Sequence, residues 1–169
     1  MTTPRIFQIS ISPGGVPKHP VHEGQVTEFG LVGDAHTDLK NHGGQDKALC
    51  LFSLERLQAL QAAGHPIFPG STGENLILSG LAWDEMQPGV RLRLGAEVCL
   101  EITSYTAPCH KIKESFAGGA FMEMSQKEHP GMARVYAKVL TPGTVRIGDV
   151  VAVRQIGTLR ERSMDKIEC

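Results

Sequence analysis

The sequence lacks the features that mark several large classes of protein. Aromatic residues make up only 5% of its 169 residues, the formal net charge is −1, and no apolar run is long enough to span a bilayer. Balanced charge gives no bulk attraction to nucleic acid or acidic lipid, and the N-terminus has no signal-peptide core. We therefore expect a cytoplasmic protein with neither a nucleic-acid nor a membrane partner.

Cysteine is also scarce and widely spaced. The four cysteines, Cys50, Cys99, Cys109 and Cys169, form no C-x-x-C pair. Disulfide frameworks and zinc knuckles need closer spacing, and a chain of this length buries a core without covalent staples. The sequence therefore predicts four reduced thiols and gives no role to Cys169.

Alternation of apolar and polar residues predicts a chain made mainly of strands. Strand patterns occur at 5–11, 25–29, 48–52, 76–78, 90–94, 97–102 and 131–140. One amphipathic helix is predicted from an N-cap at Ser53 to Ala63, with Gly64 after its end. The segment 90–102 has the pattern of a hairpin, and 145–153 repeats it, so two hairpins favour strands that curl into a barrel.

Cys109 follows the end of one of these predicted strands. Pro108 has no N–H for a ladder, so Cys109 lies on a loop, where proteins often place reactive groups. His110, Lys111 and Lys113 come next, and nearby positive charge favours the thiolate, the form that binds metals and attacks electrophiles. The alternative is a small buried apolar residue without chemistry, since free cysteine is among the most buried residue types.

A second stretch, residues 31–48, is dense in reactive groups and poor in core residues. Asp34 and His36 are two apart, so an extended chain would point them the same way. A glycine pair lets backbone N–H groups approach a ligand. The further candidates in this stretch are His42, Gly43, Gly44, Asp46 and Lys47. A solvated loop of turn residues is the alternative interpretation.

The third unusual stretch is residues 69–76, in which glycines flank two hydroxyl residues before Glu74 and Asn75. A turn of this kind, including Gly73, offers backbone donors to an anion. The alternative is a structural bend in which Glu74 and Asn75 bind loop backbone, and the spacing alone slightly favours that alternative.

Taken together, these segments resemble the MOSC domain family, named for the C-terminal domain of molybdenum cofactor sulfurases. Five motifs carry the resemblance in the family's order, from about residue 20 to 153: Gly33-Asp34-x-His36, His42-Gly43-Gly44-x-Asp46-Lys47-Ala48, Gly73-Glu74-Asn75-Leu76, Pro108-Cys109, and Arg134-Val135-Tyr136 leading to Gly148-Asp149. Each motif is weak alone, and five in order are specific. The chain resembles the small stand-alone bacterial form, without the aminotransferase-like domain that would hold pyridoxal phosphate.

The resemblance implies a fold that is mainly β with a few helices, a partly open β-barrel over residues 1–153, followed by a charged tail at 154–169. It also implies one functional cysteine, Cys109, which binds sulfur or ligates the molybdenum of a pterin cofactor. Active members reduce N-hydroxylated compounds. In many members an Arg stands where this chain has Thr106. If that Arg contacts the cofactor, either Lys47, Lys111 or Arg134 replaces it or the affinity for the cofactor is lower.

A molybdopterin site needs cations or backbone N–H groups for its phosphate and paired polar groups for its pterin edges. The residues expected to bind it are Asp34, His36, His42, Gly43, Gly44, Asp46, Lys47, Gly73, Glu74, Asn75, Lys111 and Arg134, with Cys109 on the metal. No pyridoxal phosphate is expected.

Three functions follow from this site. The first is a molybdenum-cofactor protein that reduces N-hydroxylated or related small compounds with a separate electron donor. The second is a persulfide carrier supplied by a cysteine desulfurase. The third is a non-enzymatic barrel in which Asp34, His36 and His42 hold a divalent ion such as zinc.

Overall fold

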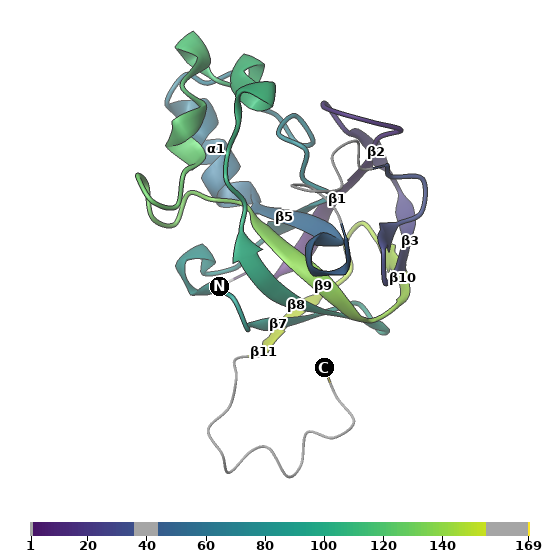
Figure 1. Cartoon of the computed structure of the whole chain (residues 1–169). Coiled ribbons are helices and arrows are strands. Elements are labelled where there is room, and N and C mark those ends of the chain that lie inside the picture. Colours follow the sequence, from purple (N-terminus) through teal and green to yellow (C-terminus); the bar gives the residue numbers. More distant parts are fainter. Residues whose placement is uncertain (1, 36–43, 155–168) are drawn as a thin grey trace.

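The structure is a computed structural model that describes residues 2–35, 44–154 and 169. Within these residues the chain consists mainly of strands, with α1 (Leu54–Ala62) as its α-helix (Figure 1). Short 3₁₀ helices lie between the strands: η1 (Gln45–Lys47), η2 (Trp83–Glu85), η3 (His110–Ser115), η4 (Ala117–Gly119) and η5 (Phe121–Met124). The described part of the chain contains no helix that is long and apolar enough to cross a membrane.

Two sheets carry the strands. The larger has the order β11-β7-β8-β9-β5-β6-β1-β2 and consists of β1 (Arg5–Ile11), β2 (His19–Val21), β5 (Leu49–Ser53), β6 (Leu76–Ser79), β7 (Arg91–Leu94), β8 (Val98–Tyr105), β9 (Val135–Thr141) and β11 (Val151–Arg154). The smaller has the order β10-β3-β4 and consists of β3 (Glu23–Thr27), β4 (Gly30–Leu31) and β10 (Gly143–Arg146). Neighbouring strands are antiparallel except β5 and β6, which are parallel and need the crossover that α1 provides.

The larger sheet curls without closing. β1 lies near one end of the strand order, yet Arg5 forms an isolated bridge with Val150, just before the strand at the other end. The Val151 N–H also donates to the Pro4 carbonyl at 2.9 Å. A sheet that approaches itself at one bridge is a partly open barrel, so the predicted fold class is confirmed.

The core forms around β5, the most enclosed strand. All five of its residues are buried, and Leu51 and Phe52 are fully so. On β8 the alternating residues Val98, Leu100 and Ile102 are at most 1% exposed, because they face the interior of the curl. Continuous burial of β5 explains why its sequence shows no alternation.

Local signals placed α1 correctly. The Ser53 hydroxyl accepts a hydrogen bond from the Arg56 N–H at 3.2 Å, as an N-cap does. Gly64 follows the helix with a φ of 98°, a left-handed conformation that glycine adopts without a Cβ clash. The predicted helix and its limits are therefore confirmed.

The second predicted hairpin is wrong. β10 and β11 do not pair with each other, because β10 pairs with β3 and β11 pairs with β7. Between them the backbone bonds to β1 instead: Ile6 donates to the Asp149 carbonyl at 2.9 Å, and Gly148 donates to the Ile6 carbonyl at 2.8 Å. The local pattern was real, but its partners are distant strands.

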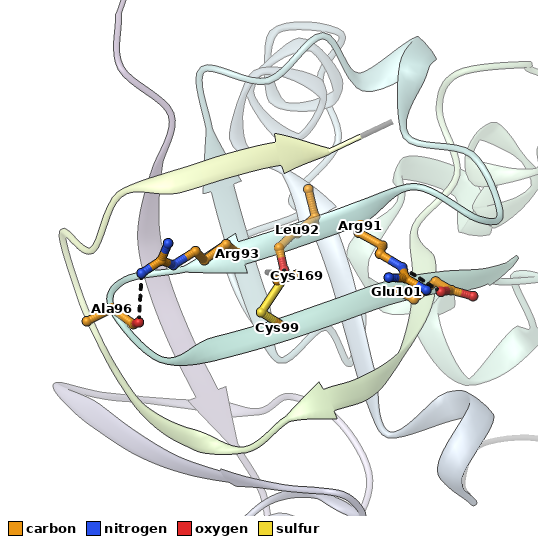
Figure 2. The surroundings of a disulfide bond; sticks show 7 residues. All are labelled: Arg91, Leu92, Arg93, Ala96, Cys99, Glu101 and Cys169. Atoms are coloured by element: carbon orange, nitrogen blue, oxygen red, sulfur yellow. Dashed lines mark hydrogen bonds and ion pairs between the residues drawn. A yellow bond between two sulfur atoms is a disulfide. The ribbon is translucent and has the colours of Figure 1, made fainter. Parts of the chain in front are cut away.

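The prediction of four reduced cysteines is also wrong. Cys99 and Cys169 form a disulfide with their Cα atoms 5.4 Å apart (Figure 2). Cys99 alternates with the inward residues of β8 and so lies on the outer face of that strand. The sulfur of Cys169 lies 3.2 Å from the Leu92 carbonyl oxygen on the neighbouring strand. Cys169 therefore joins the chain end to the outside of the sheet, and the rest of the predicted tail, residues 155–168, lies outside the described residues.

Truncation of Leu51 tests the central position of β5. Leu51 is 0% exposed, so Leu51→Ala should lower the free energy of unfolding by about 2–5 kcal/mol, because it removes buried methyl groups and leaves a cavity. Phe29→Ala is the control, since Phe29 is 64% exposed and its loss should change stability by less than about 0.5 kcal/mol. Urea titration of both variants measures this, and equal effects would contradict the proposed core.

Candidate functional site

One cavity collects about half of the candidate residues. It encloses about 100 Å³ and is walled by residues from six stretches of the chain: 15–18, 35, 47–50, 72–75, 109–112 and 134–136. The described residues that line it include no Asp, Glu or His, whereas they include three lysines and one arginine. The cavity therefore favours an anionic ligand.

Cys109 enters this cavity from a loop. It is a free thiol of intermediate exposure and lies directly before η3, where its carbonyl accepts from the Ile112 N–H at 3.1 Å. The last ladder contact before it is the bond from Thr106 N–H to the Arg134 carbonyl at 2.8 Å. The predicted loop position is therefore confirmed, and Lys111 lines the same cavity.

Arg134 brings a buried charge to the cavity wall. Its side chain is only 5% exposed, and one terminal nitrogen donates to the Thr72 carbonyl. Its Nε is buried and has no hydrogen-bond partner among the described residues. Leaving such a donor unsatisfied costs about 1–3 kcal/mol.

Glu74 is used inside its own loop. It is 0% exposed, and its carboxyl accepts from the Gly70 N–H and the Thr72 hydroxyl, both at 2.5 Å. Burial raises the pKa of this carboxyl above its usual range, and these hydrogen bonds oppose the shift. The contacts agree with the structural alternative for Glu74, because both oxygens already have partners.

Asn75 joins three segments. Its Oδ1 accepts from the Cys50 N–H at 3.0 Å, and its Nδ2 donates to Asp34 at 2.9 Å and to the Ser10 carbonyl at 3.3 Å. Asn75 lines the cavity, but its amide is already engaged with protein. Its amide therefore serves first to hold together the segments of Ser10, Asp34 and Cys50.

Asp34 is the centre of a buried ion pair. Its carboxylate accepts from Lys18 Nζ at 2.7 Å and from the Ser12 N–H at 2.9 Å, in addition to Asn75, and its side chain is 1% exposed. Both oxygens are occupied, which does not favour Asp34 as a metal ligand. No group of three or more metal-ligating side chains occurs in the described part of the chain.

Tyr136 and Cys50 line the cavity, and Thr106 packs behind Cys50. Burial raises the pKa of the Tyr136 phenol above its usual range, with Cys50 and Cys109 adding to the shift and Arg134 opposing it. Burial also raises the pKa of the Cys50 thiol. The Thr106 hydroxyl lies 3.8 Å from Cys50 Sγ and is 1% exposed, so an Arg at this position would require repacking.

The structure brings together about half of the predicted site. Of the predicted residues, those on the cavity wall are Lys47, Gly73, Asn75, Cys109, Lys111 and Arg134. Predicted residues that the structure describes away from that wall are Asp34, Gly44, Asp46 and Glu74. His36, His42 and Gly43 lie outside the described residues.

Sequence reasoning missed several wall residues. These are Gly15, Val16, Lys18, Ala35, Cys50, Thr72, Ile112 and Tyr136. Lys47 Nζ lies 5.3 Å from the centre of the Tyr136 ring, a cation–π distance. The alternation of β9 placed Tyr136 opposite the core residues, which was a usable signal. Cys50 gave none, because its strand is buried throughout.

Comparison with known proteins identifies the family. The family model of the MOSC domain matches residues 38–152. This chain therefore belongs to the MOSC domain family, as the motifs predicted.

Its relatives are longer proteins. The chain is 31% identical over 117 residues to the uncharacterized protein YflK of Bacillus subtilis (strain 168), 28% over 124 residues to protein YiiM of Escherichia coli (strain K12), and 25% over 138 residues to a reductase of Gibberella moniliformis (strain M3125 / FGSC 7600). These matches cover 69%, 71% and 78% of this chain but 52%, 54% and 24% of those proteins. The chain thus spans about half the length of the first two.

A solved structure shows the same fold. The YuaD protein of Bacillus subtilis superposes with a TM-score of 0.72 at 18% sequence identity, over 92% of this chain and 98% of that one. At this identity the likeness supports the fold alone.

Glu74→Gln tests the buried carboxyl. Because the folded-state pKa of Glu74 lies above the unfolded value near 4.5, its stabilising contribution is complete below that value and is lost as pH rises through the folded pKa. Wild-type protein should therefore lose stability relative to Glu74→Gln as the pH is raised from about 4 to 8. Urea unfolding across this range measures the difference, and a gap that widens in favour of the wild type would contradict the assignment.

Proposed function

We propose that the cavity binds the molybdenum cofactor, with Cys109 as the protein ligand of the metal. The observation that carries this is a free, partly exposed thiol opening onto a cavity walled by cations, with the buried Nε of Arg134 still lacking an acceptor. A thiolate is a soft ligand that suits such a metal. The anionic phosphate of a molybdopterin suits the cationic wall.

The residues present fit this group. Lys47, Lys111 and Arg134 supply positive charge from three different segments. Gly73 lines the cavity with a φ of 87°, a left-handed backbone conformation that glycine adopts without strain. When bound, the cofactor supplies two-electron chemistry, and the chain holds it, orients it and limits access of water.

The reaction proposed is the reduction of N-hydroxylated or related small compounds with a separate electron donor. It is supported by the family and by the fungal relative that is itself named a reductase, of which this chain matches 24%. Tyr136 lines the cavity, and its phenol is a hydrogen-bonding group beside the proposed ligand.

Cys109→Ser tests the metal ligand. Protein made in a host that synthesises the cofactor should lose molybdenum content at least about tenfold, because the hydroxyl is a poor ligand for this soft site, and reductase activity should fall with it. Cys169→Ser is the matched control, since Cys169 is not among the residues that line the cavity. Elemental analysis and thermal melting of both variants measure this. A Cys109→Ser protein that keeps its metal and its activity would refute the proposal.

A second candidate function is carriage of sulfur as a persulfide on Cys109. It is favoured by a specific observation: another free thiol, Cys50, lines the same cavity. A carrier needs an accessible thiol that takes sulfane sulfur and a protected space that holds it.

Incubation with a cysteine desulfurase and cysteine tests this function. Cys109 should gain about 32 Da, one sulfur atom, because an accessible thiolate is the acceptor of sulfane sulfur. Intact-mass and peptide analysis locate the added atom. Its absence from wild type and from Cys50→Ser alike, or its presence on Cys109→Ser, would contradict the carrier function.

A further inference from the structure

Two free thiols open onto one cavity from very different supports. Cys50 lies in the middle of β5, the enclosed strand, and is 6% exposed. Cys109 lies in the loop between β8 and η3 and has intermediate exposure. One thiol is therefore fixed and protected, while the other is reachable from solvent.

The contacts bring these thiols to the same side of the sheet. Cys50 pairs with Tyr136 in the ladder between β5 and β9, and its Sγ lies 3.8 Å from the Thr106 hydroxyl. Thr106 precedes Cys109 by three residues. Cys50, Cys109 and Tyr136 all line the one cavity. Both thiols therefore open onto the same space.

We propose that Cys50 is the resolving thiol of Cys109. It attacks Sγ of a Cys109 persulfide, forms a Cys50–Cys109 disulfide and releases the outer sulfur as hydrosulfide. The inference rests on the sulfur-carrier function proposed above and deepens it.

The step balances without an added oxidant or reductant. The bond between the two cysteine sulfurs forms as the bond between Cys109 Sγ and the outer sulfur breaks. The proton of the Cys50 thiol leaves on the hydrosulfide. The departing sulfane sulfur gains two electrons, which come from the oxidation of the two cysteine thiols to a disulfide. The net change converts a thiol and a persulfide anion into a disulfide and hydrosulfide.

The loop is the part that must move. A disulfide needs Cα atoms about 4.4–6.8 Å apart, and β5 is held on both sides by β6 and β9. Cys109 lies beyond the last ladder bond, between Thr106 and Arg134, and its backbone is held by one bond of η3, from the Ile112 N–H to its carbonyl. It therefore approaches Cys50 without breaking a strand pair.

The experiment uses a background variant, Cys99→Ser/Cys169→Ser, which removes the other disulfide. This protein and its Cys50→Ser and Cys109→Ser derivatives are treated with inorganic polysulfide and freed of excess reagent. The background protein should release about one hydrosulfide per chain and lose about 2 Da as the disulfide closes. Cys50→Ser should keep about 32 Da on Cys109 and release at least tenfold less hydrosulfide. Cys109→Ser should neither retain added sulfur at position 109 nor release hydrosulfide.

The outcomes distinguish the resolving role of Cys50 from sulfur carriage on Cys109. If Cys50→Ser loads sulfur on Cys109 but the background protein also retains it without a Cys50–Cys109 link, the resolving role is wrong and sulfur carriage stands. If no variant loads sulfur, both fail. Thermal melting checks folding, and Cys50→Ala, which adds no buried hydroxyl, replaces Cys50→Ser if the latter is unfolded.

Discussion

The arrangement around the cavity depends on Asn75. Its backbone N–H donates to the Cys50 carbonyl and its carbonyl accepts from Ser10, both at 2.7 Å, while its side chain binds the Cys50 N–H and Asp34. One residue thus joins β5, β1 and the loop of Asp34. Because the side-chain bonds of Asn75 are buried or partly buried, losing the amide would leave several polar groups unsatisfied.

Hydrogen bonds within the protein explain the polar residues that look catalytic in the sequence. Asp34 is held by Lys18 and Asn75, and Glu74 by Gly70 and Thr72. Such groups hold the cavity wall in place through contacts within the protein. Binding of a ligand then falls to the other side chains that line the cavity. The cationic side chains and the Cys109 thiol therefore carry the chemistry that we propose.

Prediction from sequence succeeded where the signal was local. The strand Arg5–Ile11, the cap at Ser53 and the loop position of Cys109 follow from alternation, capping and the missing N–H of proline. It failed where partners are distant. The repeat at 145–153 divides between two sheets, and the Cys99–Cys169 bond spans 70 residues of sequence.

The sequence by itself determined the family, the mainly β fold and the loop position of Cys109, because ordered motifs and strand periodicity are properties of neighbouring residues. Only the tertiary structure decided which polar groups face the cavity. Periodicity cannot distinguish the faces of a fully buried strand, so Cys50 became visible as a second cavity thiol only once β5 had its neighbours. Likewise, the sequence does not show that the Nε of Arg134 is buried without a hydrogen-bond partner among the described residues. That burial depends on segments distant along the chain, including Thr72, whose carbonyl accepts from a terminal nitrogen of Arg134.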